Sequence, residues 1–209
     1  MEDNNKVFVF DFDCTLTARH LFHFLHNENI FKTLYNKEYT DEFYKIIKKY
    51  FDGIDVEKSV MDDVKVKFID LIFGSEKRLE SIKNMFTHIG RDNVYISSRG
   101  YRTEINQVLK FVGLDEYINH YNIYGNEKFK STLLCELSEI NKSVFYSDDD
   151  LTEHNNFVFV KNMEMKTDDK ILQKYEHEGK TYIFYNFAKK TSEEGGLTIS
   201  AMNLIPYLV

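Results

Sequence analysis

A short apolar run that ends in two carboxylates constrains this chain more than any other feature of its sequence. Residues 7–10 read Val-Phe-Val-Phe, and Asp11, Asp13 and Thr15 follow directly. A continuous apolar run of this length predicts a strand buried on both faces, which is typical of a parallel sheet. Carboxylates at the carboxyl end of such a strand lie where open α/β sheets bind ligands, and their burial costs free energy unless a cation or a proton compensates. We therefore expect Asp11 and Asp13 to take part in chemistry.

The bulk composition narrows the classes of partner and compartment. The chain has 209 residues, of which 43% are hydrophobic, and this is enough for one sizeable core and a second small lobe. Its formal net charge of −7 gives no basic field to attract nucleic acid or an anionic membrane, so we expect neither as a partner. We also expect no leader and no membrane-spanning helix. Cys14 and Cys135 lack the spacing of metal ligands, which predicts a reducing, cytoplasmic environment.

Two regions of the chain carry different patterns of apolar residues. Residues 19–89 show only helical spacing, and this stretch ends at Gly90, which predicts a helix C-terminus. After Gly90 short apolar runs alternate with helical segments, which predicts an α/β fold with a Rossmann-like, doubly wound parallel sheet. The strands predicted after the first one cover residues 94–96, 121–124, 144–146 and 157–160. The helices predicted between them cover residues 105–112 and 133–140.

The order of these patterns predicts one core interrupted by an insertion. We assign residues 1–18 and 90–209 to the α/β core and residues 19–89 to an inserted helical segment, called the helical insert below. An insertion directly after the first strand lies over the carboxyl edge of the sheet, where it would act as a lid. The tail is less regular, and the sequence indicates no role for residues 161–209 and no oligomeric state. For the tail we expect a polar helix over residues 168–177, an aromatic strand over 182–187 and a short helix over 197–205.

Four polar clusters follow strands or begin helices of the predicted sheet. Each cluster taken singly has an ordinary structural explanation, such as a helix cap, a surface lysine or a turn. The carboxyl ends of parallel strands meet at one edge, however, so we expect the clusters to converge although they are far apart in the sequence. The clusters are Asp11/Asp13/Thr15, Ser97/Ser98, Lys128/Lys130 and Asp148/Asp149/Asp150.

These clusters resemble the four motifs of haloacid dehalogenase superfamily phosphohydrolases, in the same order. The first motif of that family, Asp-x-Asp-x-Thr after an apolar strand, is matched by Asp11, Asp13 and Thr15. The second motif, a serine or threonine that ends the next strand, is matched by Ser97. The resemblance covers residues 6 to about 160, and the helical insert is similar to the family's first-position (C1) cap.

The third and fourth motifs are matched with some ambiguity of position. Lys130 fits the third motif best, because leucines follow it at helical spacing, and Lys128 is the alternative. The fourth motif, an apolar strand that ends in paired acids, is matched by Asp148 and Asp149. The acidic triplet leaves open which of these two fills the metal-ligand position, and Asp150 is expected to face solvent or support the others.

The resemblance implies a role for each motif residue. Asp11 would attack phosphorus and form an aspartyl-phosphate, and Asp13 would act as the general acid and base. A Mg²⁺ ion would be held by Asp11, the backbone carbonyl of Asp13, and Asp148 or Asp149. The side chains expected to bind the substrate phosphate are those of Thr15, Ser97, Ser98 and Lys130, or Lys128 in place of Lys130.

The function that the resemblance implies is that of a Mg²⁺-dependent phosphatase acting on a phosphate monoester. A lid over the site favours a small phosphorylated metabolite, such as a sugar phosphate, a nucleotide or a phospho-amino acid. The alternatives are a phosphatase acting on a nucleic-acid end or a phosphoprotein, a phosphomutase, and a catalytically inactive binding protein. The acidic charge and the lid count against macromolecular substrates, and the presence of every reactive residue counts against an inactive protein.

Several residues beside the motifs are open to more than one interpretation. Cys14 stands where many relatives have glycine, and we expect it to pack beside the site. Some cationic side chains near the motifs could contact a substrate anion, although surface charge or a satisfied histidine explains each of them equally well. These residues are Arg19, His20, His23, Arg99 and Arg102.

Overall fold

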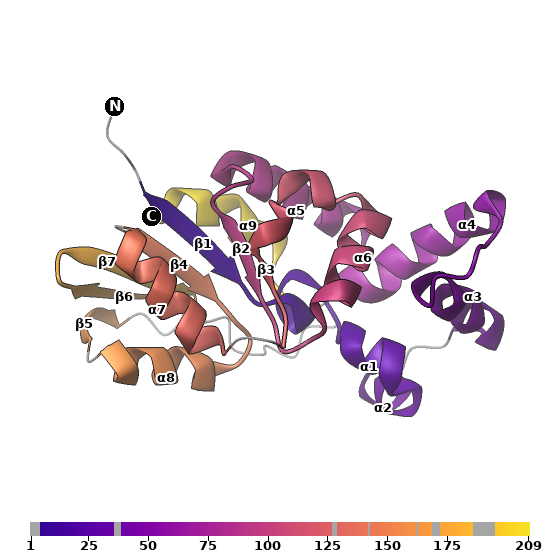
Figure 1. Ribbon diagram of the computed structural model, residues 1–209, viewed down its shortest axis with the longest axis horizontal. Helices are drawn as coiled ribbons and strands as arrows, with labels where there is room; N and C mark the ends of the chain where they lie inside the picture. The colour runs from indigo at the N-terminus through magenta and orange to yellow at the C-terminus, as the bar shows by residue number, and fades with distance from the viewer. Residues whose placement is uncertain are drawn as a thin grey trace.

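A seven-stranded sheet forms the centre of the computed structural model, within the described residues 5–35, 39–126, 129–141, 143–161, 163–168, 172–185 and 195–209 (Figure 1). The strand order across the sheet is β3-β2-β1-β4-β7-β6-β5. The strands are β1 (Lys6–Phe10), β2 (Val94–Ser97), β3 (Ile123–Tyr124), β4 (Ser143–Ser147), β5 (Glu164–Asp168), β6 (Leu172–His177) and β7 (Lys180–Tyr185).

Five neighbouring strands, in the order β3-β2-β1-β4-β7, pair in parallel, and β1 lies at their centre. Because alternate side chains of a strand point to opposite faces, β1 contributes to both cores of the sheet. Phe8 and Phe10 belong to the core on one face, whereas Val7 and Val9 belong to the core on the other. This explains why the run is apolar at every position, and the predicted Rossmann-like α/β fold is confirmed.

Helices cover both faces of the sheet (Figure 1). On one face lie α5 (Glu76–Ile89), α6 (Arg102–Val112) and α9 (Ile199–Leu204), and α5 contacts α9. The rings of Phe86 in α5 and Phe10 in β1 lie 5.8 Å apart. The other face is covered by α7 (Lys130–Ile140) and α8 (Leu151–Lys161).

Within its described residues, the helical insert contains four α-helices before α5. They are α1 (Leu21–His26), α2 (Glu28–Tyr35), α3 (Asp41–Phe51) and α4 (Lys58–Phe68). These four extend from one end of the molecule, whereas α5 lies against the sheet (Figure 1). The ring of Phe24 in α1 is fully buried and contacts the rings of Phe31, Phe43 and Phe68. The division of the chain at residues 19 and 89 stays a prediction.

Two predictions for the second half of the chain are wrong. Residues 157–160, predicted as a strand, belong to α8. A short apolar run does not distinguish a strand from a buried helix segment, and the helix begins where the backbone N–H of Thr152 donates to the Asp150 carboxylate at 2.9 Å. As no proline or glycine follows for several residues, the helix continues through the apolar run.

The stretch 168–177, predicted as a polar helix, instead contains the last residue of β5 and all of β6, which pair antiparallel at the edge of the sheet. Polar side chains dominate there because an edge hairpin leaves much of its surface in water. Residues 169–171 lie outside the described residues. The turn between β6 and β7 is formed by Glu178 and Gly179, whose φ angles of 52° and 74° are typical of a tight hairpin. The predicted strand 182–187 is found as β7, although residues 186 and 187 lie outside the described residues. Among the helices that the structure describes, none is long and apolar enough to cross a membrane.

Candidate active site

The parallel pairing of β1 and β4 brings two carboxylates together. Phe10 is paired with Ser147, so Asp11 and Asp148 leave the sheet at the same level, and the backbone N–H of Asp11 donates to the Ser147 carbonyl at 2.9 Å. Both side chains are buried, with 4% of Asp11 and 0% of Asp148 exposed. Two carboxylates stripped of water at one sheet edge require a compensating positive charge.

Lys130 supplies part of that charge. It is the first residue of α7 and is 7% exposed. Its ammonium donates to Asp11 Oδ1 at 2.7 Å and to Asp148 Oδ2 at 2.7 Å. Burial alone would lower the pKa of Lys130, but the charges of Asp11 and Asp148 outweigh this effect and raise its pKa above the ordinary value. Lys130 therefore bridges the two carboxylates as a cation.

The orientation of the Asp148 carboxylate is fixed from two further sides. Oδ1 accepts a hydrogen bond from the backbone N–H of Asp150 at 2.8 Å, and Oδ2 accepts one from the hydroxyl of Tyr146. The Tyr146 side chain is fully buried, and it precedes Asp148 by two residues. The sequence analysis missed Tyr146, although residues two apart at a strand end project to the same side.

Three carboxylates at this edge could hold a divalent cation. Asp11, Asp148 and Asp149 each offer an oxygen, and these atoms all lie within 4.8 Å of one another. Carboxylate oxygens are the ligands that Mg²⁺ prefers in proteins. With Lys130 as the nearby cation, the three carboxylates keep an excess of negative charge that a divalent ion would neutralise, so these residues fit a Mg²⁺ site. Asp150 is placed differently, since its carboxylate accepts from Arg99 at 3.2 Å.

Asp13 lies in a wide turn over Phe12–Leu16 that joins β1 to the helical insert. Its Oδ1 accepts a hydrogen bond from the backbone N–H of Leu21 at 2.5 Å. Burial raises the pKa of Asp13 to about 6, against the opposing effect of the backbone N–H groups of Leu21 and Phe22. The loop after β2 approaches from the other side, since a Cβ on Gly100 would lie 3.6 Å from Asp13 Oδ2. Asp13 therefore lies between the insert and the core in an environment that favours a protonated carboxyl.

Three predicted hydroxyl groups are buried near this edge. Phe10 of β1 is paired with Ile96 of β2, so Ser97 leaves the sheet level with Asp11. The Ser98 hydroxyl accepts from the backbone N–H of Gly100 at 3.0 Å. Thr15 Oγ1 is buried and has no hydrogen-bond partner among the residues that the structure describes. An unsatisfied buried hydroxyl costs free energy, and a bound ligand would relieve that cost.

Cys14 adopts a left-handed conformation with a φ of 61°, which accounts for the preference for glycine at this position among the proteins it resembles. Its Sγ lies 3.4 Å from the hydroxyl of Tyr35 in α2, so the side chain packs against α2 beside the site, as expected. Burial raises the pKa of its thiol to about 12, so the thiol stays protonated at neutral pH.

The other cationic candidates make contacts of their own. Arg99 pairs with Asp150 and Glu153, and Arg102 donates to the His120 carbonyl at 3.1 Å. The rings of His20 and His23 lie 4.9 Å apart. Lys128 lies outside the described residues, so its role as the alternative to Lys130 stays a prediction.

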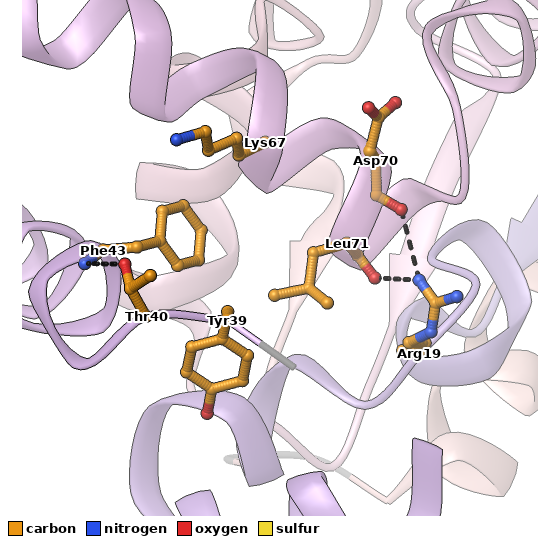
Figure 2. Close-up of a pocket in the computed structure, with 7 residues that line it drawn as sticks. All are labelled: Arg19, Tyr39, Thr40, Phe43, Lys67, Asp70 and Leu71. Carbon is orange, nitrogen blue, oxygen red and sulfur yellow. Dashed lines mark hydrogen bonds between the residues drawn. The ribbon is translucent and has the colours of Figure 1, made fainter. Parts of the chain in front are cut away.

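The helical insert lines an open cavity of about 350 Å³, and none of the motif residues lies in its wall (Figure 2). Aromatic and aliphatic side chains form part of its wall, and polar, cationic and acidic residues form the rest. The guanidinium of Arg19 donates to the backbone carbonyls of Asp70 and Leu71, so much of its hydrogen-bonding capacity is used within the wall (Figure 2). The residues around the cavity are Arg19, Tyr39, Thr40, Phe43, Lys67, Asp70 and Leu71.

Comparison with known proteins identifies the fold. No family model and no curated protein matches the sequence. Among solved structures, the chain is similar to the Legionella pneumophila effector Ceg4 bearing an N-terminal yeast Hog1p sequence. The identity is 16% and the TM-score is 0.51, with 99% of this chain and 97% of that chain covered. The chain shares its overall fold with this structure.

A second similar structure is the HAD domain of the L. pneumophila effector Lem4. The identity is 17% and the TM-score is 0.46, with 90% of this chain and 88% of that chain covered. At these identities the likeness concerns the fold alone. The chemistry of this chain therefore has to be argued from its own residues.

Proposed function

We propose that this protein is a Mg²⁺-dependent phosphatase that hydrolyses phosphate monoesters through an aspartyl-phosphate. The observation that carries the proposal is the ammonium of Lys130, which lies 2.7 Å from both Asp11 and Asp148 at the carboxyl edge of the sheet. A buried group of acids held by one cation is suited to bind a divalent metal and a phosphoryl group together. Asp11, Asp148 and Asp149 would hold the metal with the backbone carbonyl of Asp13, and the bound ion would neutralise charge on the phosphoryl oxygens.

In the first step a carboxylate oxygen of Asp11 attacks phosphorus. A P–O bond forms to Asp11 while the bond to the leaving oxygen breaks, and the carboxyl of Asp13 donates its proton to that oxygen. The raised pKa of Asp13, about 6, keeps a usable fraction of this acid protonated near neutral pH.

In the second step water attacks the phosphorus of the aspartyl-phosphate. The carboxylate of Asp13 accepts a proton from this water, the bond to Asp11 breaks, and inorganic phosphate is released. Lys130 would balance the charge of the Asp11 carboxylate before attack and the charge of the phosphoryl group afterwards, and the hydroxyls of Thr15, Ser97 and Ser98 would bind phosphoryl oxygens. The unsatisfied hydroxyl of Thr15 supports this assignment.

The substrate that we propose is a small phosphorylated metabolite. The backbone of Leu21, at the start of the helical insert, contacts Asp13 directly, so the insert borders the position where a leaving group would sit. Acting as a lid, the insert would restrict the size of the molecule that reaches Asp11. The net charge of −7 also disfavours polyanionic nucleic acid.

A panel of phosphate esters, each assayed with Mg²⁺ and with chelator, tests the proposal. The panel includes sugar phosphates, nucleotides, phospho-amino acids, a phosphopeptide and a 3′-phosphorylated oligonucleotide. We expect Mg²⁺-dependent release of phosphate, fastest from a small metabolite. Preference for the phosphopeptide or oligonucleotide would favour a macromolecular substrate, and no release from any ester would favour an inactive binding protein.

A further inference from the structure

The turn that carries Asp13 and Thr15 is held from behind by a buried guanidinium. Arg78 lies in the first turn of α5 and is 2% exposed. Its guanidinium donates to two carbonyls of the turn, Leu16 O at 2.6 Å and Thr15 O at 3.0 Å. It also donates to Phe73 O at 3.0 Å and to Leu197 O at 3.0 Å. One side chain thus ties together the turn, the segment that precedes α5 and the C-terminal segment.

The C-terminal segment lies directly against the same turn. The backbone N–H of Leu197 donates to Thr15 O at 2.9 Å. Gly196 has a φ of +81°, and a Cβ there would lie 2.4 Å from Thr17 O and 2.8 Å from Thr15 O. A Cβ on Gly195 would lie 2.2 Å from Ala18 O. Only glycine permits this approach of two backbones, so the segment over residues 195–197 is shaped to fit the turn.

We propose that Arg78, together with the segment over residues 195–197, positions the turn that carries Asp13 and Thr15 for phosphoryl transfer. This inference rests on the function proposed above. Burying a cation is costly unless it is well solvated by the protein, and here carbonyl groups replace the lost water. The planar guanidinium holds several carbonyls in a fixed geometry, which a lysine ammonium does not reproduce. The turn needs such support because Cys14 within it adopts the left-handed conformation.

The positioning role explains a part of the tail that the sequence left without a function. Asp13 is the group that must reach the leaving oxygen, and a misplacement of about 1 Å at a reacting group can lower the rate about 10²-fold. Arg78 does not touch the carboxylate of Asp13 in any described contact, so it acts through the backbone of Thr15 and Leu16. We therefore predict that substitutions which loosen this support lower kcat and leave KM nearly unchanged.

Two variants and a matched control test this role. Arg78→Lys keeps the charge but loses the planar fork, and Gly196→Ala places a methyl group against Thr17 O and Thr15 O. Gly179→Ala is the control, because its φ of +74° imposes a similar backbone cost while no atom lies within 4 Å of the added Cβ. Circular dichroism establishes the temperature at which each variant is folded, and all measurements are made there.

The first readout is amide hydrogen exchange of the peptide covering residues 12–18, measured without substrate. Its reporters are the N–H of Thr17, which donates to Phe12 O at 3.0 Å, and that of Ala18, which donates to Ile72 O at 2.8 Å. We expect exchange in this peptide at least about tenfold faster in Arg78→Lys and Gly196→Ala than in wild type, with peptides of β4 unchanged. The second readout is hydrolysis of p-nitrophenyl phosphate, where we expect kcat to fall about 10- to 100-fold at nearly constant KM.

Faster exchange together with the fall in kcat, in either folded variant and not in Gly179→Ala, supports the positioning role. Unchanged exchange over residues 12–18, or faster exchange with an unchanged kcat, overturns it. If wild-type protein hydrolyses no phosphate ester, the proposed phosphatase function fails, while the exchange measurement still tests whether Arg78 and Gly196 hold the turn.

Discussion

The carboxyl edge of the sheet and the interior of the helical insert contain different kinds of side chain. At the edge, buried carboxylates share one ammonium, and polar hydrogen bonds fix their positions. In the insert, aromatic rings pack around Phe24, and the charge of Arg19 is turned toward backbone carbonyls in the cavity wall. The buried carboxylates at the edge need further positive charge to balance them, whereas aromatic packing holds the interior of the insert together. We infer that chemistry belongs to the edge and substrate choice to the insert.

The sharpest test of the edge compares two neighbouring acids. Asp148→Asn removes a buried carboxylate that is bonded to Lys130, and we expect phosphatase activity to fall at least about 10³-fold with a large loss of Mg²⁺ affinity. Asp150→Asn is the control, because that side chain pairs with Arg99, and it should change activity less than about threefold. Isothermal titration with Mg²⁺ and phosphate-release assays measure both effects. Equal effects of the two substitutions would contradict the assignment.

Removal of the bridging cation should have the next largest effect. Lys130→Met leaves Asp11 and Asp148 buried without their ammonium, so we expect kcat to fall about 10²-fold and the melting temperature to fall as well. Added Mg²⁺ should raise the melting temperature of the variant more than that of wild type, because the ion replaces the missing charge. Lys174→Met, at a surface lysine 3.4 Å from Glu176, should leave activity and melting temperature nearly unchanged. Thermal unfolding with and without Mg²⁺ provides the comparison.

The pH dependence of the rate should report the protonation of Asp13. Its pKa is raised to about 6, so the acid form is present below that pH and is lost above it. For an alkyl phosphate, whose leaving oxygen needs a proton, kcat/KM should fall up to about tenfold per pH unit above pH 6. For p-nitrophenyl phosphate, whose leaving group departs without a proton, the decline should be shallower. A decline of the same steepness for both substrates would argue against Asp13 as the general acid.

The smallest effect is expected in the insert. Lys67→Ala shortens a side chain in the wall of the insert cavity and leaves the residues at the carboxyl edge of the sheet unchanged. Mg²⁺ affinity and kcat for p-nitrophenyl phosphate should therefore stay within about twofold of wild type. The order of preference among larger phosphate esters should change instead. A loss of Mg²⁺ affinity in this variant would mean that the insert and the edge are not separable. Titration with Mg²⁺, together with kinetic assays on p-nitrophenyl phosphate and on larger phosphate esters, tests this prediction.

The parts of the fold that could be predicted are those in which a short segment has a clear pattern of apolar residues. The run Val7–Phe10 is apolar throughout because both faces of β1 are buried, and the acids after it fall at the sheet edge as a direct result. The edge hairpin of β5 and β6 carries no apolar alternation of comparable strength, and its polar residues are equally compatible with a helix. Periodicity thus indicates buried strands better than edge strands.

The candidate site divides in the same way. The acids and Lys130 lie at strand and helix ends, where sequence position alone places them near one edge. The support provided by Arg78 could not be predicted from the sequence. Its partners Leu16, Thr15 and Leu197 are separated from it by 62, 63 and 119 positions, and it contacts their backbone carbonyls, which every residue possesses. Tyr146 is intermediate: its spacing from Asp148 is visible in the sequence, but the contact depends on burial.

The most direct test of the account is the substitution Asp11→Asn, assayed on p-nitrophenyl phosphate with Mg²⁺ and with chelator. It removes the attacking carboxylate oxygen and keeps the size of the side chain. We predict that wild-type protein releases phosphate only with Mg²⁺, and that Asp11→Asn loses at least about 10⁴-fold of this activity while remaining folded. Substantial Mg²⁺-dependent turnover by Asp11→Asn, or wild-type activity that chelator leaves intact, would contradict the central claim.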